Sequence, residues 1–149
     1  MSLLTTLNED IKTAMRAKDK PTLDVLRMLK ASVQNEQIAK GADLTSDEEI
    51  SVLAREMKQR RDSMIEFEKA GRDDLLANVE AGIVIVEKYL PAQLSESEIR
   101  DIVSAAIAQT SASSMKEFGA VMGVVMPQVK GKADGNLVNS IVKELLTSK

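Results

Sequence analysis

The sequence predicts an all-α protein in two parts, residues 1–90 and 92–149. Apolar residues recur at helical spacing along nearly the whole chain, and Ser-x-x-Glu capping patterns precede several of these stretches. We expect about four helices in the first part and a small three-helix bundle in the second. Tyr89-Leu90-Pro91 marks the boundary, because the residue before a proline is disfavoured in the α-helical conformation.

The predicted helices of the first part cover residues 3–18, 21–40, 46–70 and 73–88. Pro21 suits a first helical position, and Gly41 suits the end of the same helix. Ser46-Asp47-Glu48-Glu49 matches a capping box, whose acidic residues are favourable near a helix N-terminus.

Residues 82–86 leave two alternatives open. The run Gly-Ile-Val-Ile-Val could form a short buried strand, because β-branched residues favour that state. No other stretch of the sequence offers a strand partner, and a lone strand leaves its backbone groups unpaired. We therefore favour a helix through these residues.

The second part opens at a capping pattern, Ser95-x-x-Glu98, and a second pattern, Ser114-x-x-Glu117, follows the polar loop 111–114. Gly131 to Gly135 is predicted to be a turn. The last helix carries the apolar residues Leu137, Val138, Ile141, Val142, Leu145 and Leu146.

Composition removes several classes of chemistry. The 149 residues include no histidine, cysteine or tryptophan, which excludes an imidazole acid/base, a thiolate nucleophile and the common structural zinc sites. The formal net charge is −3, so binding of RNA would need a local basic patch. The N-terminus is unlike a signal peptide, and no apolar run is long enough to cross a membrane. We expect a cytoplasmic protein without membrane association that holds a partner rather than transforming one.

Three short motifs resemble catalytic or ligand sites, and each has a simpler structural interpretation. Ser113-x-x-Lys116 has the spacing of a serine nucleophile with its lysine, but no companion motif is present, and capping serines explain it better. Gly131–Gly135 could cradle a phosphate, yet it lacks the P-loop spacing and is better read as a turn. Asp47-Glu48-Glu49 reads as a solvated helix start. We predict no catalytic residue, cofactor or metal.

Basic residues are the remaining lead. In the second helix, helical spacing places four polar residues on one face: Arg27, Lys30, Gln34 and Gln37. The third helix and the turn after it contain a cluster of polar and basic residues: Arg55, Lys58, Gln59, Arg60, Arg61 and Arg72. Planar guanidinium groups suit phosphate recognition. The alternative is an ordinary solvated surface, with i,i+4 pairs Glu56–Arg60 and Glu36–Lys40.

Several blocks of the sequence, in order, resemble the GatB/YqeY family. They are Arg27-Met28-Leu29, Asn35-x-x-Ile38, Glu56-Met57-Lys58-Gln59-Arg60-Arg61-Asp62-Ser63, Ala70-Gly71-Arg72-Asp73-Asp74-Leu75, Tyr89-Leu90-Pro91-x-Gln93-Leu94-Ser95, Phe118-Gly119-x-Val121-Met122 and Gly131-Lys132-Ala133-Asp134-Gly135. The resemblance implies an all-helical protein whose second part is similar to the tail domain of the B subunit of tRNA-dependent amidotransferase. That tail is implicated in holding tRNA.

The resemblance does not extend to catalysis. The catalytic domain and partner amidase of the amidotransferase have no counterpart in this sequence, so a label of carbon–nitrogen ligase activity with glutamine as amido-N-donor would be inherited from the larger enzyme. The sequence also departs from the family pattern at Val79 and Gly82, where acidic residues are usual. Loss of those acids would leave the basic cluster around Arg60 and Arg72 with fewer partners.

Our first hypothesis is a tRNA-binding module associated with amidotransferase-type function, without catalysis of its own. Its predicted phosphate-binding residues are Arg27, Lys30, Lys58, Arg60, Arg61, Arg72, Lys130 and Lys132. The alternative is a protein-interaction adaptor that binds a partner helix and no RNA. A third hypothesis, amide transfer by this chain itself, would require glutamine hydrolysis that depends on Ser113.

Overall fold

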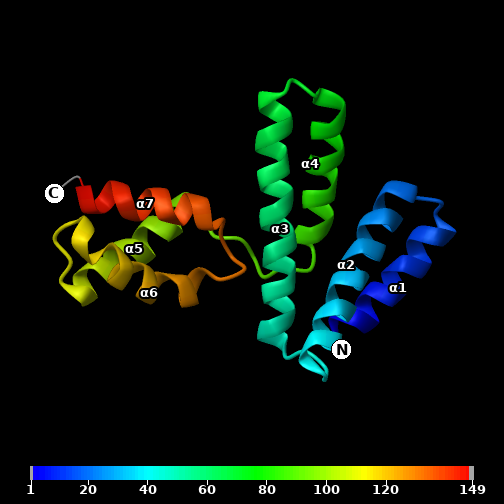
Figure 1. Ribbon diagram of the computed structural model, residues 1–149, viewed down its shortest axis with the longest axis horizontal. Coiled ribbons are helices and arrows are strands. Elements are labelled where there is room, and N and C mark those ends of the chain that lie inside the picture. Colours follow the sequence, from blue (N-terminus) through cyan, green and yellow to red (C-terminus); the bar gives the residue numbers. More distant parts are fainter. Residues whose placement is uncertain (1, 148–149) are drawn as a thin grey trace. The chain divides into compact units, whose positions relative to one another are not determined.

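A computed structural model describes residues 2–147, and all regular structure in that range is helical (Figure 1). Seven α-helices and one short 3-10 turn occur there, with no strand, so the prediction of an all-α protein is confirmed. Contacts between residues gather into two compact units, one up to Pro91 and the other from Ala92 onward. Each unit is described by itself.

The first unit contains two helical hairpins. Its helices are α1 (Leu3–Arg16), α2 (Lys20–Lys40), α3 (Ser46–Lys69) and α4 (Asp73–Glu87). The helices α1 and α2 pack antiparallel, as do α3 and α4, and α2 contacts both helices of the second hairpin (Figure 1). Because α4 runs unbroken through residues 82–86, the helical alternative for this stretch is confirmed.

The ends of α2 follow from local chemistry. Asp19 caps its start by accepting a hydrogen bond from the backbone N–H of Thr22 at 3.3 Å, and Pro21 lies in the first turn. Gly41 ends the helix in the left-handed conformation, at φ 77°, which glycine adopts without steric cost.

The capping box of α3 lies one residue earlier than predicted. The Thr45 hydroxyl accepts from the N–H of Glu48, and the Glu48 carboxylate accepts from the N–H of Thr45. The predicted pair of Ser46 with Glu49 is therefore wrong. Glu49 instead accepts a hydrogen bond from the backbone N–H of Leu3 at 2.7 Å, so it satisfies a free donor at the start of α1.

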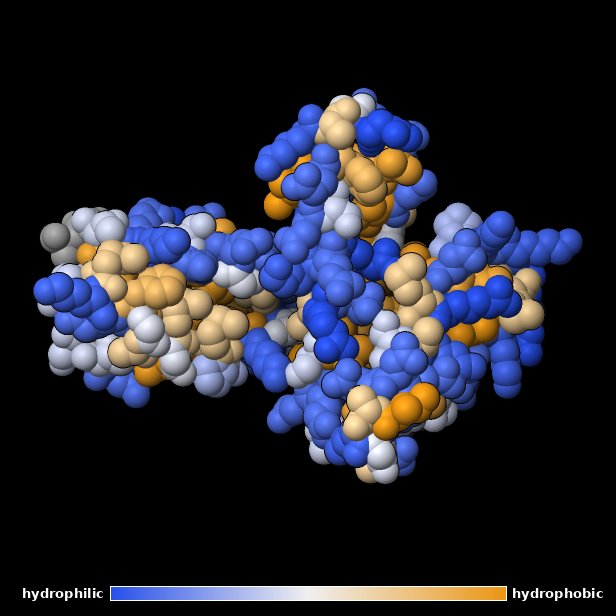
Figure 2. All heavy atoms as spheres, in the orientation of Figure 1, coloured by the Kyte–Doolittle hydropathy of each residue, from blue (hydrophilic) through white to orange (hydrophobic). Residues whose placement is uncertain are grey.

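All four helices contribute to the core of the first unit. Its buried side chains are Leu7, Ala14, Leu26, Leu29, Val33, Val52, Leu53, Met57 and Val86. Hydrophobic residues also follow the seam between α3 and α4, while hydrophilic residues cover the outside of α3 (Figure 2). Fully burying a leucine or valine side chain contributes about 1.5–3 kcal/mol, so this core accounts for the orientation of α2 against the α3–α4 hairpin.

The second unit is built from α5 (Glu96–Thr110), a 3-10 turn η1 (Met115–Glu117), α6 (Phe118–Val129) and α7 (Gly135–Thr147). The predicted capping boxes of Ser95 with Glu98 and of Ser114 with Glu117 are both confirmed. A separate core, rich in valine and isoleucine, holds these helices together: Ile99, Val103, Ala106, Ile107, Ala112, Val121, Val125, Val129, Val138, Ile141, Val142 and Leu146.

The α2 packing gives a direct stability prediction. Leu29 is completely buried, so Leu29→Ala leaves a cavity and should lower the free energy of unfolding by about 2–5 kcal/mol in urea denaturation. Ile38→Ala on the same helix is the control, because the Ile38 side chain is 78% exposed and should change stability by less than about 0.5 kcal/mol. Equal losses in the two variants would contradict the orientation of α2.

Candidate nucleic-acid interface

The surface of α2 that faces away from the core carries an unusual mixture of side chains. Leu26, Leu29 and Val33 point into the core, and the opposite side of the helix is exposed. We call this exposed side the α2 outer face and define it by Arg27, Ala31, Gln34, Asn35 and Ile38. These residues place one cation, two side-chain amides and exposed aliphatic surface on the same side of successive helical turns.

The middle of α2 carries positive charge only, although the exposed Asp24 lies one turn before Arg27. Residues 25–35 contain Arg27 and Lys30 and no aspartate or glutamate. The next acid, Glu36, is engaged by Arg55 of α3, with Nη2 3.1 Å from the carboxylate. The positive charge of Arg27 and Lys30 is therefore not neutralised by acids within this stretch of their own helix. Lys30 is partly buried on the flank of the outer face.

A shallow groove continues the outer face at the C-terminal end of α2. It has a volume of about 630 Å³ and is lined by Gln34, Asn35, Gln37, Ile38, Gly41 and Ala42. Side-chain amides both donate and accept hydrogen bonds, which is the chemistry needed to contact the edges of unpaired bases. The groove therefore adds amide chemistry to the same helix that carries Arg27 and Lys30.

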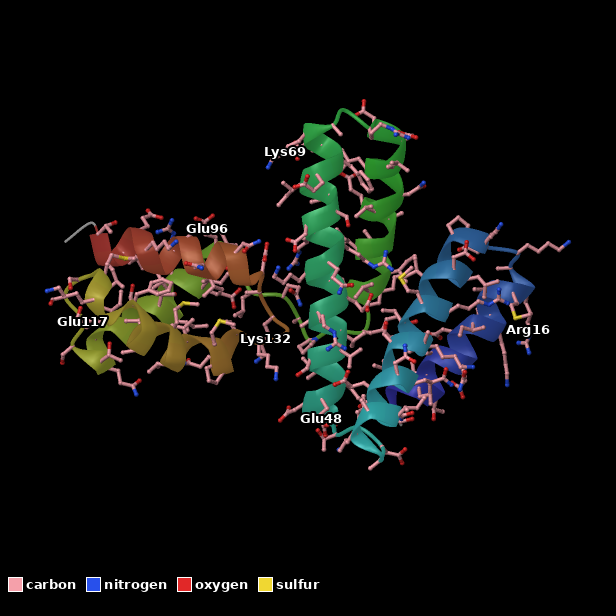
Figure 3. All side chains as sticks on the ribbon, in the orientation of Figure 1. Arg16, Glu48, Lys69, Glu96, Glu117 and Lys132 are labelled. Atoms are coloured by element: carbon pink, nitrogen blue, oxygen red, sulfur yellow. The ribbon has the colours of Figure 1, made fainter. Side chains whose placement is uncertain are left out.

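The predicted basic residues of the α3–α4 hairpin are more dispersed. Lys58 forms an ion pair with Asp62 at 2.9 Å, and Arg61 is partly buried one turn further along α3. Lys69 lies at the far end of α3, beside the turn that carries Arg72 (Figure 3). The eleven residues from Lys58 to Lys69 correspond to about 16 Å along the helix, so Arg72 lies well beyond Lys58.

The Arg72 side chain forms an ion pair with Asp74. Its guanidinium donates to both carboxylate oxygens of Asp74, at 3.3 and 3.2 Å. This hydrogen bonding lowers the pKa of Asp74. Both side chains are exposed, so the pair is open to solvent and contributes little to stability.

Arg60 is partly buried where α3 contacts α2 and α4. Its Nη2 lies 3.3 Å from the sulfur of Met28 on α2, and its buried Nε has no hydrogen-bond partner. A Cβ added at Gly82 of α4 would come within 2.7 Å of Arg60 Nη1. The guanidinium thus occupies the space that a side chain at position 82 would need.

The two expected i,i+4 pairs are not the contacts that form. Glu56 is buried and accepts a hydrogen bond from the hydroxyl of Ser32 at 2.7 Å, not from Arg60. Lys40 bridges to Glu48 at 2.6 Å rather than to Glu36. Both predictions are wrong because contacts between neighbouring helices compete successfully with contacts along one helix.

In the second unit, Lys130 and Lys132 are exposed on either side of Gly131. Gly131 has a φ of 74°, and its carbonyl accepts from the Gln93 side chain at 2.9 Å. The Lys132 carbonyl accepts from the Leu94 N–H at 2.8 Å. The turn therefore anchors the segment that leads into α5, and Lys132 lies in this loop before α7 (Figure 3).

The short motifs at Gly131–Gly135 and Ser114 have the structural roles that the simpler interpretation predicts. Asp134 accepts a hydrogen bond from the N–H of Asn136 at 3.1 Å, so an acidic side chain already caps α7 where a phosphate cradle would need free donors. Ser114 caps η1 and exchanges hydrogen bonds with Glu117. Within residues 2–147, no group of three or more acidic side chains is arranged to hold a metal ion. None of the helices in that range is long and apolar enough to cross a membrane.

A second pocket, which the sequence analysis did not identify, lies where α1, α2 and the end of α4 meet. The Tyr89 hydroxyl donates a 2.5 Å hydrogen bond to the Asp10 carboxylate at its edge. Burial and the negative charge of Asp10 both raise the pKa of Tyr89. The residues are 79 positions apart, so no local spacing could have indicated the pair.

Comparison with known proteins identifies relatives of this chain. The family model described as Yqey-like protein matches residues 4–146. A protein of Pyrenophora tritici-repentis named Altered inheritance of mitochondria protein 41, mitochondrial, is 30% identical over 99% of this chain and 82% of its own length. Proteins of the same name from Kluyveromyces lactis (33% identical; 86% of this chain, 67% of the relative) and Lachancea thermotolerans (38%; 66% and 54%) also match.

These relatives correct one prediction. The names of these relatives place them in mitochondria, which contradicts the expectation of a cytoplasmic protein. The chain spans between about half and four fifths of the length of these three relatives. What the longer proteins do as a whole is therefore not transferred to it.

The Tyr89–Asp10 bond gives a pH-dependent prediction. The hydrogen bond requires the neutral phenol, and the pKa of Tyr89 is raised in the folded state. Its contribution should be complete below the unfolded-state pKa of about 10 and should disappear as the pH rises through the folded-state value. Near neutral pH, Tyr89→Phe should lower the free energy of unfolding by about 1–2 kcal/mol, and this difference should shrink at alkaline pH.

Absorbance of the phenolate provides an independent check, because Tyr89 is the single tyrosine and tryptophan is absent. The folded protein should ionise at higher pH than the same chain in denaturing urea. Identical titration curves for the folded and unfolded protein would show that the bond to Asp10 does not form.

Proposed function

Since the chain belongs to the YqeY-like protein family, we propose that it is a non-catalytic helical module that binds RNA, with tRNA as its ligand. The resemblance to the amidotransferase tail domain supports tRNA rather than another RNA, and it supports a role beside tRNA-dependent amide transfer. Chemistry on the tRNA would then belong to a partner enzyme.

The α2 outer face is the observation on which this proposal rests. It combines Arg27, two amides and exposed Ile38, with Lys30 on its flank and no acid among residues 25–35. When cations of a protein contact phosphates, counterions bound to the RNA are released into solution. This release favours association even when the whole protein is slightly acidic. The groove at the C-terminal end of α2 adds the side-chain amides of Gln34, Asn35 and Gln37, which can hydrogen-bond to bases.

The scarcity of aromatic residues shapes the proposed mode of binding. Two phenylalanines and one tyrosine leave little surface for stacking on unpaired bases. Affinity should therefore come mainly from phosphate contacts and depend strongly on salt. Of the other predicted residues, Lys58 and Arg61 on α3 are proposed to extend the contact, and Lys130 and Lys132 to make one in the second unit.

The test is binding of purified protein to total tRNA, measured by fluorescence anisotropy at several salt concentrations. Replacing Arg27 and Lys30 together by glutamine should weaken binding and reduce the slope of log affinity against log salt by about 1.5–2, because each lost phosphate contact removes close to one unit. Circular dichroism checks that the variant remains helical.

A matched control separates a local contact from a change in net charge. Lys12 and Lys69 are exposed residues of α1 and α3, and their joint replacement by glutamine removes the same charge. This control should leave the slope nearly unchanged. If both double variants lose affinity equally, binding depends only on the overall charge of the protein and the α2 outer face is not the binding surface. If the parent protein does not bind tRNA even at low salt, the whole proposal is wrong.

A further inference from the structure

Side chains of both charge signs line the pocket that lies between α1, the start of α2 and the end of α4. The pocket has a volume of about 340 Å³ and is lined by Asp10, Thr13, Ala14, Ala17, Asp19, Thr22, Leu26, Ile85, Lys88 and Tyr89. Its charged members are Asp10, Asp19 and Lys88, and none of the three belongs to an ion pair within residues 2–147. The pocket therefore offers two negative charges and one positive charge to a ligand.

Hydrogen bonds hold the two carboxylates of this pocket in place. Asp10 is partly buried and accepts a 2.5 Å bond from the Tyr89 hydroxyl. Asp19 caps α2 and also accepts from the Thr22 hydroxyl at 2.7 Å. A carboxylate has about four acceptor positions, so both groups retain acceptor positions for an ammonium group.

The rest of the lining is largely aliphatic. Ala14 and Leu26 are buried and form the floor, and Ile85 of α4 is partly buried beside them. Ala14 and Ala17 share one face of α1, and their short side chains leave the space open. Sites for small molecules start at about 300 Å³ and combine an apolar lining with a few polar groups. This pocket has that size and that composition.

We propose that this pocket binds a small aliphatic amino acid, whose ammonium group is bound by Asp10 and Asp19 and whose carboxylate is bound by Lys88. Hydrogen bonds between groups of opposite charge are stronger than those between neutral groups. The aliphatic side chain of the ligand packs against Leu26 and Ile85.

The mixed charge of the lining selects this class of ligand over others. Lys88 repels a simple amine, and the two aspartates repel a simple carboxylate or a phosphodiester. A zwitterion presents the opposite charge to each of them. Residues inside a protein chain have no free α-ammonium or α-carboxylate group, so a free amino acid is the small molecule that carries both beside an aliphatic side chain.

L-Leucine is the probe, because it carries both charges and a branched aliphatic side chain. Two matched controls each lack one charge: 3-methylbutylamine is leucine without its carboxylate, and 4-methylpentanoate is leucine without its ammonium group. Fluorescence of Tyr89 reports on the pocket alone, since it is the single tyrosine in a chain without tryptophan. At neutral pH, leucine should change this signal in a saturable manner. Each control should bind about tenfold more weakly or worse, because it lacks one charge-assisted contact.

Variants assign leucine binding to the proposed side chains. Asp10→Asn removes a negative charge but keeps an acceptor oxygen for Tyr89, and Lys88→Gln removes the positive charge. Each should weaken leucine binding by about tenfold or more, measured by calorimetry so that the affinity does not depend on the tyrosine signal. Glu9→Gln and Lys12→Gln make the same charge changes at exposed positions of α1 outside the lining, and they should leave the affinity unchanged. Lys88 is exposed, so its variant keeps the test valid if Asp10→Asn fails to fold.

Three results would overturn this proposal. The first is the absence of a saturable response to leucine at concentrations up to about 10 mM, which would show that the pocket does not bind it. The second is equal affinity for leucine and either control, because one of the two charges would then play no part. The third is an unchanged leucine affinity in Lys88→Gln or in a folded Asp10→Asn variant. None of these measurements involves tRNA or the Arg27 and Lys30 variants, so RNA binding and amino-acid binding can fail separately.

Discussion

The packing of α2 against the α3–α4 hairpin is the constraint on which the other features of the first unit depend. Leu29 of α2, Leu53 of α3 and Val86 of α4 are all fully or almost fully buried in one core. Burial of this side of α2 leaves the side with Arg27 and Ile38 in solvent. The same packing brings Arg60 between α2 and α4, against Gly82.

This arrangement gives two arginines of the first unit, Arg27 and Arg60, different surroundings. Arg27 lies on the α2 outer face, where water solvates its charge in the unbound protein. Arg60 is partly buried against Met28 and beside Gly82, so it is less open to a phosphate than Arg27 is. A single count of basic residues would treat the two alike. Only Arg27 belongs to the surface that we propose for RNA.

The helical fold was predictable because its signals are local. Apolar spacing, the caps at Ser95 and Ser114 and the stop at Gly41 each lie within a few residues of sequence. The same local rules misplaced the box at Thr45 by one residue. The site was less predictable, since the Arg55–Glu36 pair and the position of Arg60 depend on how separate helices pack. The predicted phosphate-binding role of the basic residues stays a prediction.

The most direct test of this account is an NMR map of the residues that respond to tRNA, recorded on the intact protein at physiological salt. We predict that amide signals of the α2 outer face, including Arg27, Gln34 and Ile38, shift as tRNA is added, while those of Ala81 and Gly82 on α4 do not. Shifts confined to α4, or no shifts in α2, would contradict the proposal that the outer face binds RNA.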